Sequence, residues 1–486
     1  MPAARTQCII HFLPEKDKKE ADMKENAKQS DFGSGSMRSN ILRLAVPLTA
    51  AQIINLLYNI IDRMFIGHLS ENSTLALTGL GLTFPVILLI TAFTNLFGMG
   101  GSALFSIARG QKDLERAENL EGTAFAMLLL TSIVLMSISY LVKRPLLYLF
   151  GASDQTFPYS NQYLSVYLIG TPMIMLSLGM NTFINAQGFG RKGMMTVAIG
   201  AVLNILLDPL FIFVLKMGVQ GAAVATVISQ TVSSIWVLTT ITSRKMAVPL
   251  RLRAVRVHGR LLAEIVKLGF SGFVMSFTNS LVSIVCNATL QRYGGDIYVG
   301  VMTVLSSIRE LVSKPVSGLT GAAEPVLGFN YGAGKYSRVK QGIRFMSVTA
   351  IVYTTAAWIL LLLFPKLFIS IFNTDPELVE RAIPSLTMYF FGFFMMSLQM
   401  AGQATFVGLG RAKSAIFFSI FRKVVIVVPL TLLLPRFWNL GVKGVFLAEP
   451  VSNWIGGAAC FITMMLTVYT KLPADRQPET VPDSDT

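Results

Sequence analysis

The sequence has little charge and little cysteine. Only 14% of its 486 residues are Asp, Glu, Lys or Arg, while 53% are hydrophobic, and this balance excludes an ordinary soluble domain. Its three cysteines (Cys8, Cys286 and Cys460) are too scattered for a disulfide framework or a metal cluster. The chain contains no Gly-x-x-x-x-Gly-Lys-Ser/Thr phosphate loop and no Asp-Asp-x-x-Asp motif. We therefore expect neither direct ATP coupling nor Mg²⁺-dependent prenyl transfer.

Acidic residues are also fewer than basic ones, with 26 Asp and Glu against 41 Lys and Arg. The basic residues gather in alternate loops, as the cytoplasmic loops of membrane proteins require, so the excess reports topology rather than nucleic-acid binding. The densest basic run lies at mid-chain and comprises Arg244, Lys245, Arg251, Arg253, Arg256 and Arg260. We expect both termini in the cytoplasm, and the polar N-terminus indicates no cleavable signal peptide.

Long apolar runs make up most of the chain. A helix needs about 20 apolar residues to cross about 30 Å of hydrocarbon. Such runs lie at residues 41–67, 78–107, 121–142, 159–187, 193–215, 220–243, 261–290, 298–329, 342–364, 383–408, 414–435 and 441–469. The sequence therefore predicts an all-α integral membrane protein with twelve transmembrane helices.

The twelve runs form two related sets of six. The Gly-Phe-Gly-Arg sequence at 188–191 recurs as Gly-Leu-Gly-Arg at 408–411, and Gly-Val-Gln-Gly at 218–221 recurs as Gly-Val-Lys-Gly at 441–444. This duplication predicts two pseudo-symmetric six-helix lobes. Two such lobes can rock about a central cavity and open it to each side of the membrane in turn, as in many secondary transporters.

The repeat and the charge pattern divide the chain into five segments. They are a polar cytoplasmic tail at 1–38, a first lobe at 39–243, a basic cytoplasmic linker at 244–260, a second lobe at 261–470 and a cytoplasmic tail at 471–486. We expect the first tail to be disordered, because it is polar and carries both signs of charge. Met23 and Met37 offer alternative translation starts within it.

Acidic side chains inside the first lobe need a reason, because a charge at membrane depth costs about 2.5–3.5 kcal/mol on insertion scales. Asp62 lies in the first span and Asp208 in the fifth, and Asn204 shares a helix face with Asp208 at i, i+4 spacing. Pro209 removes a backbone donor beside Asp208 and favours an irregular, hydrated pocket. Two carboxylates in one low-dielectric cavity disfavour each other's ionised form, which suits proton binding and release. The alternative is that each acid is tied to Arg63 or to a helix end.

The second lobe has no counterpart to these two acids. The charged residues inside its spans are Arg309, Glu310, Lys314, Glu324, Arg422, Lys423 and Glu449. Two interpretations stay open. In one, the charges compensate each other, with Glu310 paired to Lys314 at i, i+4 and Arg422 paired to Glu449 or Glu310. In the other, Glu310, Arg422 and Glu449 line a substrate cavity.

Aromatic and methionine side chains crowd the tenth span. They are Phe390, Phe391, Phe393, Phe394, Met395, Met396 and Met400. Such a face could line a cavity for flat cations by stacking and cation–π attraction, with Met396 and Gln399 as candidate contacts. The alternative is ordinary packing or contact with lipid.

Four motifs resemble those of the multidrug and toxic compound extrusion (MATE) transporters, and the resemblance covers nearly all of residues 40–470. They are Tyr-Asn-Ile-Ile-Asp-Arg-Met-Phe-Ile-Gly at 58–67, Asn-Ile-Leu-Leu-Asp-Pro-Leu-Phe-Ile at 204–212, Gly-Val-Gln-Gly-Ala-Ala-Val-Ala-Thr at 218–226 and Pro-Val-Leu-Gly-Phe-Asn-Tyr-Gly-Ala-Gly at 325–334. The loop sequences are most similar to those of MepA-like bacterial members, and the first-lobe motifs match the DinF-like branch.

The resemblance implies a site for the coupling ion on four residues of the first lobe. The positions that match the DinF-like branch are Asp62, Asn204, Asp208 and Thr226. It also implies a bend of the first helix at Pro47, and Asn59 of the first motif is a candidate for the substrate cavity. Glu324 stands where many relatives have a neutral residue, which leaves its role open. The acids that the NorM-like branch carries on its seventh and tenth helices have no match here.

We therefore expect a secondary active multidrug exporter of the bacterial cytoplasmic membrane. It would exchange H⁺ or Na⁺ for amphipathic cationic drugs or dyes by alternating access. We expect no cofactor, no enzymatic activity and no obligate protein partner, and the one metal would be Na⁺ in transit at the ion site. The alternative is a lipid-linked oligosaccharide flippase of the same superfamily. Its pyrophosphate would need a groove lined by basic residues, for which the candidates are Arg309, Lys314, Arg422 and Lys423.

Overall fold

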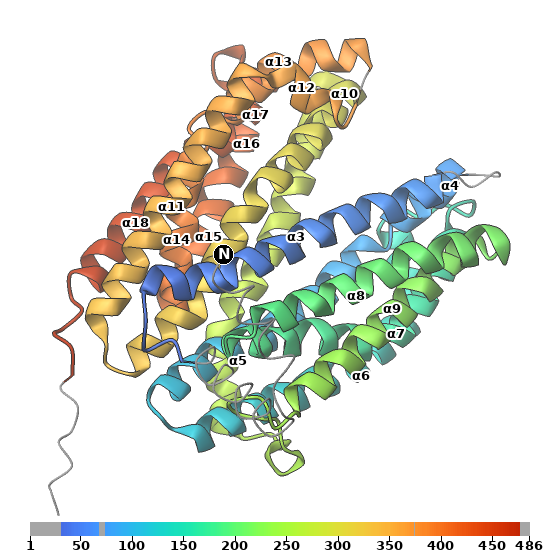
Figure 1. Cartoon of the computed structure of the whole chain (residues 1–486). Coiled ribbons are helices and arrows are strands. Elements are labelled where there is room, and N and C mark those ends of the chain that lie inside the picture. The colour runs from blue at the N-terminus through green and yellow to red at the C-terminus, as the bar shows by residue number, and fades with distance from the viewer. Residues whose placement is uncertain (1–30, 68–72, 374, 477–486) are drawn as a thin grey trace, which may run out of the picture.

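The computed structural model describes residues 31–67, 73–373 and 375–476. All regular secondary structure in these ranges is helical (Figure 1). The parts of the predicted tails at 1–30 and 477–486, including Met23, lie outside the described residues.

The first half of the chain folds into long helices. They are α3 (Met37–Gly67), α4 (Ser73–Gly81), α5 (Phe84–Gly110), α6 (Leu114–Leu149), α7 (Phe157–Ala186), α8 (Gly190–Pro209), the π-helical turn η1 (Leu210–Val214) and α9 (Gly218–Ile241). Two of them, α4 and α5, follow each other closely and form one apolar span over Thr78–Gly110. The linker to the second half contains the 3-10 turn η2 (Leu252–Ala254).

The second half is more interrupted than the first. Its elements are α10 (Gly259–Gly332), α11 (Tyr336–Leu363), α12 (Pro365–Ser370), α13 (Pro376–Tyr389), α14 (Phe394–Gly408), α15 (Ala412–Ile420), η3 (Phe421–Val427), α16 (Val428–Leu433), η4 (Phe437–Asn439), α17 (Val442–Ser452), η5 (Asn453–Gly457), α18 (Ala458–Met464) and η6 (Met465–Tyr469). The tenth predicted span, 383–408, is broken, because α13 and α14 meet at 53°. Gly392 lies in this break with φ of 67°, and an added Cβ there would lie 2.2 Å from Trp454 Nε1.

The longest helix, α10, is two membrane spans. At about 1.5 Å per residue, 74 residues in a straight helix would be far longer than a bilayer is thick. The backbone leaves the helical conformation at Gly295, with φ of 69° and ψ of −169°. Residues 259–294 and 296–332 are therefore two arms of α10. With α10 divided and α13 and α14 counted as one broken span, the predicted all-α fold with twelve spans is confirmed.

The helices form two bundles that lie close together near α5 and diverge toward α4 and α13 (Figure 1). We call α3 to α9 the N-lobe and α10 to α18 the C-lobe. Each lobe has a hydrophobic core, around Phe105 and Phe183 in the N-lobe and around Phe390 and Phe446 in the C-lobe. A third core joins the start of α3 to α10 and α11. The first helix is thus packed into both lobes.

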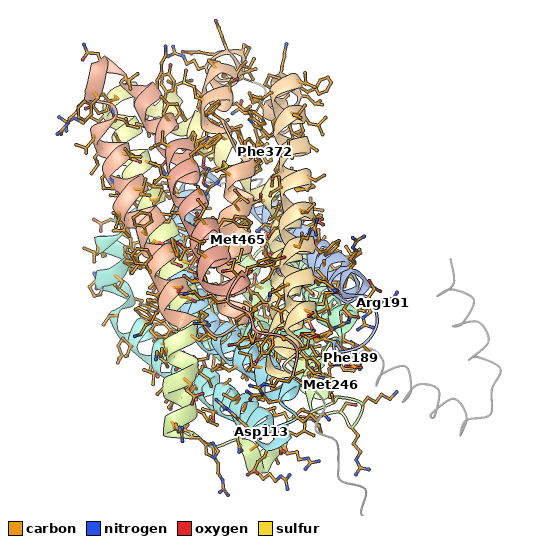
Figure 2. All side chains as sticks on the ribbon, turned by 90° about the vertical axis from the view of Figure 1, so that its left-hand side faces the viewer. Asp113, Phe189, Arg191, Met246, Phe372 and Met465 are labelled. Atoms are coloured by element: carbon orange, nitrogen blue, oxygen red, sulfur yellow. The ribbon has the colours of Figure 1, made fainter. Side chains whose placement is uncertain are left out.

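The loops that the charge pattern assigns to the cytoplasm lie at one end of the molecule. Figure 2 shows Asp113, Phe189 and Met246 toward this end and Phe372 at the opposite end. Hydrogen bonds tie these segments together: Gln187 Nε2 donates to the Val248 carbonyl at 3.0 Å. We call this end the linker face, because it carries the linker between the lobes.

The chain just before α3 is attached to the C-lobe at the linker face. Phe32 is fully buried, and its ring meets that of Phe329 edge-on at a centroid distance of 5.8 Å. The Phe32 carbonyl accepts hydrogen bonds from the side chains of Asn330 and Arg338, each at 3.0 Å. This contact lies within residues 31–36, which belong to the tail that was expected to be disordered and which precede α3. Lys335 and Arg338 also donate to the backbone carbonyls of Gly33 and Gly35, each at 2.8 Å, so one apolar side chain and several hydrogen bonds attach this polar segment.

The two lobes touch through the backbones of α5 and α10. A Cβ added at Gly269 would lie 1.8 Å from the Leu96 carbonyl oxygen, and one at Gly100 would lie 2.5 Å from the Ile265 carbonyl oxygen. Small residues permit such close approach of helices in a membrane. These contacts hold the lobes together where they meet.

Candidate functional sites

The structure brings the four predicted ion-coupling residues together in the N-lobe. Asp62 comes from α3, Asn204 and Asp208 from α8 and Thr226 from α9, and all four are buried. The Asn204 side chain donates to Asp208 Oδ1 and to Thr226 Oγ1, each at 3.3 Å. The carboxyl group of Asp62 contacts that of Asp208. We call these four residues the N-lobe cluster.

Two oxygen atoms of the N-lobe cluster have no hydrogen-bond partner among the described residues. They are Asn204 Oδ1 and Asp208 Oδ2, and Asp208 is 0% exposed. Buried polar atoms are normally paired, so these two oxygen atoms have the capacity to accept a ligand. Amide and carboxylate oxygens suit a proton or a hard cation. Within 31–67, 73–373 and 375–476, no three His, Cys, Asp or Glu side chains are grouped so that they could hold a metal ion.

Three tyrosines that were not among the predicted site residues lie around the N-lobe cluster. Tyr58 lies one helical turn before Asp62, and Tyr163 and Tyr167 of α7 stack at a centroid distance of 6.0 Å. Tyr58 and Tyr163 both interact with Asp62 and Thr226. The i, i+4 spacing of Tyr58 and Asp62 was a local signal for this contact. The interaction of Tyr163 of α7 with Asp62 of α3 joins two different helices, and no local spacing predicted it.

The two predicted helix-bending prolines lie in different surroundings. Pro209 ends the α-helical part of α8 directly after Asp208, and the chain continues as the π-helical turn η1. A proline cannot donate the next helical hydrogen bond, which accounts for the wider turn. Pro47 lies inside α3, which is helical on both sides of it. A Cβ added at Gly190 of α8 would lie 3.1 Å from Pro47 Cγ, so the two helices pack closely there.

A second buried cluster lies in the C-lobe around Glu449 of α17. Glu449 Oε1 accepts hydrogen bonds from Arg309 at 2.5 Å, Arg422 at 3.0 Å and Lys423 at 3.4 Å. Arg422 also donates to Asn453 Oδ1 at 2.5 Å. The pairing of Arg422 with Glu449 was one of the predicted options, and the structure adds two further cations to it. We call Arg309, Arg422, Lys423 and Glu449 the C-lobe cluster.

Two π-helical turns and one glycine shape the C-lobe cluster. Arg422 and Lys423 lie in η3, and Asn453 begins η5. Such turns widen a helix locally and are frequent at functional sites. A Cβ added at Gly456 would lie 2.8 Å from Arg422 Cγ, so a residue without a side chain leaves room for the arginine.

Four of the predicted substrate-cavity residues lie outside both clusters, and two of these, Glu310 and Asn59, are exposed. Glu310 pairs with Lys314 at 2.9 Å, as the i, i+4 spacing predicted, and its side chain is 55% exposed. It belongs to a row of exposed polar residues on the second arm of α10, at Thr303, Ser306 and Glu310, which we call the polar stripe. Asn59 is exposed, and its amide donates to the Asn55 carbonyl at 2.6 Å. A polar stripe at membrane depth faces water or protein rather than lipid, so Glu310 remains a candidate.

The two candidates of the tenth span differ in burial. Met396 is 7% exposed and packs in the C-lobe core, which favours the packing interpretation for this residue. Gln399 is half-buried, and its Oε1 has no hydrogen-bond partner among the described residues. Phe391 stacks on Trp454 at 6.4 Å, and both are exposed. The predicted aromatic face is therefore divided between core and surface.

Two further features lie apart from the clusters. Glu324 is half-buried on the second arm of α10 and forms no ion pair with any described residue, so its role stays open. An apolar crevice of about 270 Å³ lies between α3, α10 and α11, lined by residues such as Ala45, Leu319 and Tyr353. None of the predicted site residues lines it.

Comparisons with known proteins converge on one group. A family model described as MatE matches residues 47–210 and 273–433, which fall in the two lobes. The multidrug export protein MepA of Staphylococcus saprophyticus is 24% identical over 440 residues, covering 90% of this chain and 95% of that protein. MepA of Staphylococcus aureus is 23% identical over 431 residues, covering 88% and 93%.

The solved structures that are similar share the whole architecture. One is described as the outward-facing conformation of a multidrug resistance MATE family transporter of the MOP superfamily. It has a TM-score of 0.86 and 24% identity, covering 92% of this chain and 98% of that one. Another, a MATE protein in complex with MaL6, has a TM-score of 0.85 and 24% identity, covering 90% and 97%.

Proposed function

Because the chain belongs to the MatE family of multi-pass membrane transporters, we propose that it exports amphipathic cationic small molecules in exchange for H⁺ or Na⁺. The observation that carries this proposal is the buried N-lobe cluster, in which two carboxyl groups meet beside unpaired oxygen atoms. We place the protein in the bacterial cytoplasmic membrane. The basic linker favours an orientation with the linker face and both termini in the cytoplasm.

The N-lobe cluster can bind an ion because its two acids repel each other when both are ionised. One H⁺ or Na⁺ between Asp62 and Asp208 relieves this repulsion, and Asn204 and Thr226 offer further oxygen atoms. Asp62 is carried by α3 and Asp208 by α8. Ion binding would therefore change the position of α3 relative to α8. Because α3 is also packed into the C-lobe, this change can reach the other lobe.

In the proposed cycle, the outward-facing protein accepts the ion and α3 shifts, which lowers the affinity for bound drug. The protein then turns inward, releases the ion and binds a new drug molecule. Such coupling requires only that ion and drug favour different states. A tenfold gradient of the ion supplies about 1.4 kcal/mol per ion exchanged, and each net charge that moves across 100 mV adds about 2.3 kcal/mol.

The test is transport of a cationic dye by purified protein in liposomes, under an imposed pH gradient or an imposed sodium gradient. We expect one of the gradients to drive the dye in the wild type and to fail in Asp208→Asn. Asp296→Asn is the matched control, because Asp296 is an exposed acid beside the bend of α10. Dye movement that neither gradient drives would contradict antiport. Driven transport that survives in Asp208→Asn would keep the function and remove the proposed ion site.

A flippase for lipid-linked oligosaccharides is the second candidate, and the convergence of Arg309, Arg422 and Lys423 is what favours it. Lys314, which the prediction included in the basic groove, pairs instead with Glu310. Reconstituted protein and a fluorescent lipid pyrophosphate would decide between the two functions. A flippase would move this lipid between leaflets without either gradient and would not concentrate the cationic dye.

A further inference from the structure

The C-lobe cluster holds more positive than negative charge. Arg309, Arg422 and Lys423 all donate to Glu449, and no other carboxylate of the described residues forms an ion pair with any of them. Arg422, Lys423 and Glu449 have side chains that are 9%, 6% and 7% exposed. Buried charges are stable when they are paired. The cluster therefore has the charge to accept a further anion.

Its hydrogen-bond donors are not used up either. The three cations all point to the same atom, Glu449 Oε1. Arg422 Nε is buried and has no hydrogen-bond partner within the described part of the chain. A guanidinium group carries five N–H donors in a planar fork that matches the oxygen atoms of a carboxylate or a phosphate. An anionic group would satisfy donors that the protein leaves open.

Arg309 links the buried cluster to an accessible surface. Its side chain is 29% exposed, unlike those of the other three members of the cluster. It lies three residues after Ser306 of the polar stripe, and i, i+3 residues are neighbours on a helix surface, so the exposed part of Arg309 borders this stripe. The Arg309 guanidinium also lies over the ring of Tyr389 at 5.9 Å, which places an aromatic group beside the charge.

We propose that Arg309, Arg422 and Lys423 bind an anionic group of the transported molecule. The preferred substrates are then amphipathic zwitterions, in which a carboxylate or a similar acid accompanies the cationic ring system. This inference rests on the proposed export function and specifies its substrate class. In this scheme Glu449 holds the three cations together before substrate binds, and the substrate anion then shares them.

The test compares a fluorescent rhodamine that carries a free carboxylate with the methyl ester of the same dye. Fluorescence polarisation measures the binding of each dye to the purified full-length protein in detergent. We expect the wild type to bind the free acid about tenfold more tightly than the ester, as one charge-assisted contact would give. Arg422→Gln should reduce this ratio to about one. Lys423→Met replaces the buried ammonium group with an apolar side chain of similar length. The ratio of acid to ester affinity should fall in this variant too.

Arg381→Gln is the matched control. Arg381 is a base of the same lobe, but it forms an exposed pair with Glu377 at 2.7 Å, away from the cluster. Its substitution should leave the ratio unchanged. Equal binding of acid and ester by the wild type would overturn the proposal. So would a preference for the acid that persists in both Arg422→Gln and Lys423→Met.

Two competitors separate the sources of an anion. The proposal expects neither inorganic phosphate nor phosphatidylglycerol in mixed micelles to abolish the difference between acid and ester. Abolition by phosphate would assign the cluster to a free inorganic anion. Abolition by phosphatidylglycerol would assign it to a lipid head group. Either result would overturn the assignment to a transported molecule.

The binding assay needs no ion gradient, so its result is independent of antiport. Suppose the ester is exported under a gradient and the acid is not preferred; the proposed function then stands and the anion site falls. Suppose instead that the preference for the acid is lost in Arg422→Gln, but no gradient moves either dye. The anion site then stands and antiport falls.

Discussion

The two lobes carry buried polar clusters of opposite charge, and α8 and α9 of the N-lobe cluster correspond in the duplication to the η3 and α17 segments of the C-lobe cluster. The N-lobe cluster joins two carboxyl groups to an amide and a hydroxyl. The C-lobe cluster joins three cations to one carboxylate. Duplication has therefore kept the place of a polar centre in each bundle while its chemistry has changed. Two lobes of one fold can in this way bind partners of opposite charge.

One pair of positions shows this change most directly. The motifs at 218–221 and 441–444 align Thr226 with Glu449. Thr226 accepts a hydrogen bond at the edge of the N-lobe cluster, whereas Glu449 is the centre of the C-lobe cluster. The acid at this position is needed in the C-lobe because three cations surround it. In the N-lobe, a third acid would add to a repulsion that is already present.

The largest expected effect is the loss of stability in Glu449→Gln. Removing the one carboxylate leaves Arg309 and the buried Arg422 and Lys423 uncompensated, and breaking a buried ion pair costs about 3–5 kcal/mol. Thermal unfolding in detergent measures this loss. Glu310→Gln breaks an exposed pair and should cost less than about 1 kcal/mol. The double variant Glu449→Gln/Arg422→Gln should recover part of the loss. If Glu449→Gln alone kept the stability of the wild type, Glu449 would not be needed to compensate the three cations.

Asp208→Asn should act in the opposite way on stability and strongly on transport. The substitution removes the repulsion between two carboxyl groups, so we expect the unfolding temperature to stay the same or rise. Gradient-driven dye transport should fall about a hundredfold, because the ion loses one charged ligand and its affinity for the site should fall about a hundredfold. Initial uptake rates in liposomes test this. A destabilisation as large as that of Glu449→Gln would remove the contrast between the lobes.

A smaller effect is expected at the contact between the lobes. In Gly269→Ala the new Cβ meets the Leu96 carbonyl, and overpacking of this kind costs about 1–3 kcal/mol. The lobes should then separate more often. A cysteine placed at Ser106, which is 0% exposed and faces Gly328 of α10, reports this by its labelling rate in a cysteine-free background.

The labelling rate at this position should rise about tenfold or more. Gly81→Ala is the control, because a Cβ at Gly81 has no atom within 4 Å. An unchanged rate in Gly269→Ala would mean that this contact does not hold the lobes together.

The smallest effect is expected for Thr226→Val. It removes the acceptor at 3.3 Å from Asn204, and a neutral hydrogen bond contributes about 0.5–1.5 kcal/mol. The ion concentration that gives half-maximal transport should rise about fivefold. Thr226→Ser keeps the hydroxyl and should behave like the wild type. Equal behaviour of the valine and serine variants would exclude Thr226 from the ion site.

Local patterns in the sequence predicted local contacts well. The spacing of Glu310 and Lys314 predicted their ion pair, which is confirmed at 2.9 Å. The spacing of Asn204 and Asp208 likewise predicted a shared helix face, and the two side chains are hydrogen-bonded. Such pairs lie on one helix, where a fixed rise and rotation per residue determine the neighbours. Asp62 lies on another helix, so no spacing rule placed it beside them; it was predicted as the second carboxylate of one buried cavity, and the family resemblance added it to the same site.

Contacts between helices were predicted less well. Arg309 and Lys423 stand out in the sequence as charges within spans, but their convergence on Glu449 depends on how three separate helical segments are placed. Tyr163 and Tyr167 went unnoticed because α7 carries no charge to draw attention to that face. Met396, a predicted cavity residue, is packed in the core. Hydropathy could not separate these cases, since core, lipid contact and cavity wall are all apolar in a membrane protein.

The sequence by itself determined the number of spans, their grouping into two related lobes and the end of the molecule that carries the basic linker. Length, hydropathy and charge decide these properties, because the bilayer acts on each helix separately. Only the tertiary structure decided which polar groups meet. That outcome depends on close helix contacts such as Gly100 against α10 and on breaks such as Gly295 and Gly392. These features rotate and shift whole helices, and a small rotation decides whether a buried charge faces a partner.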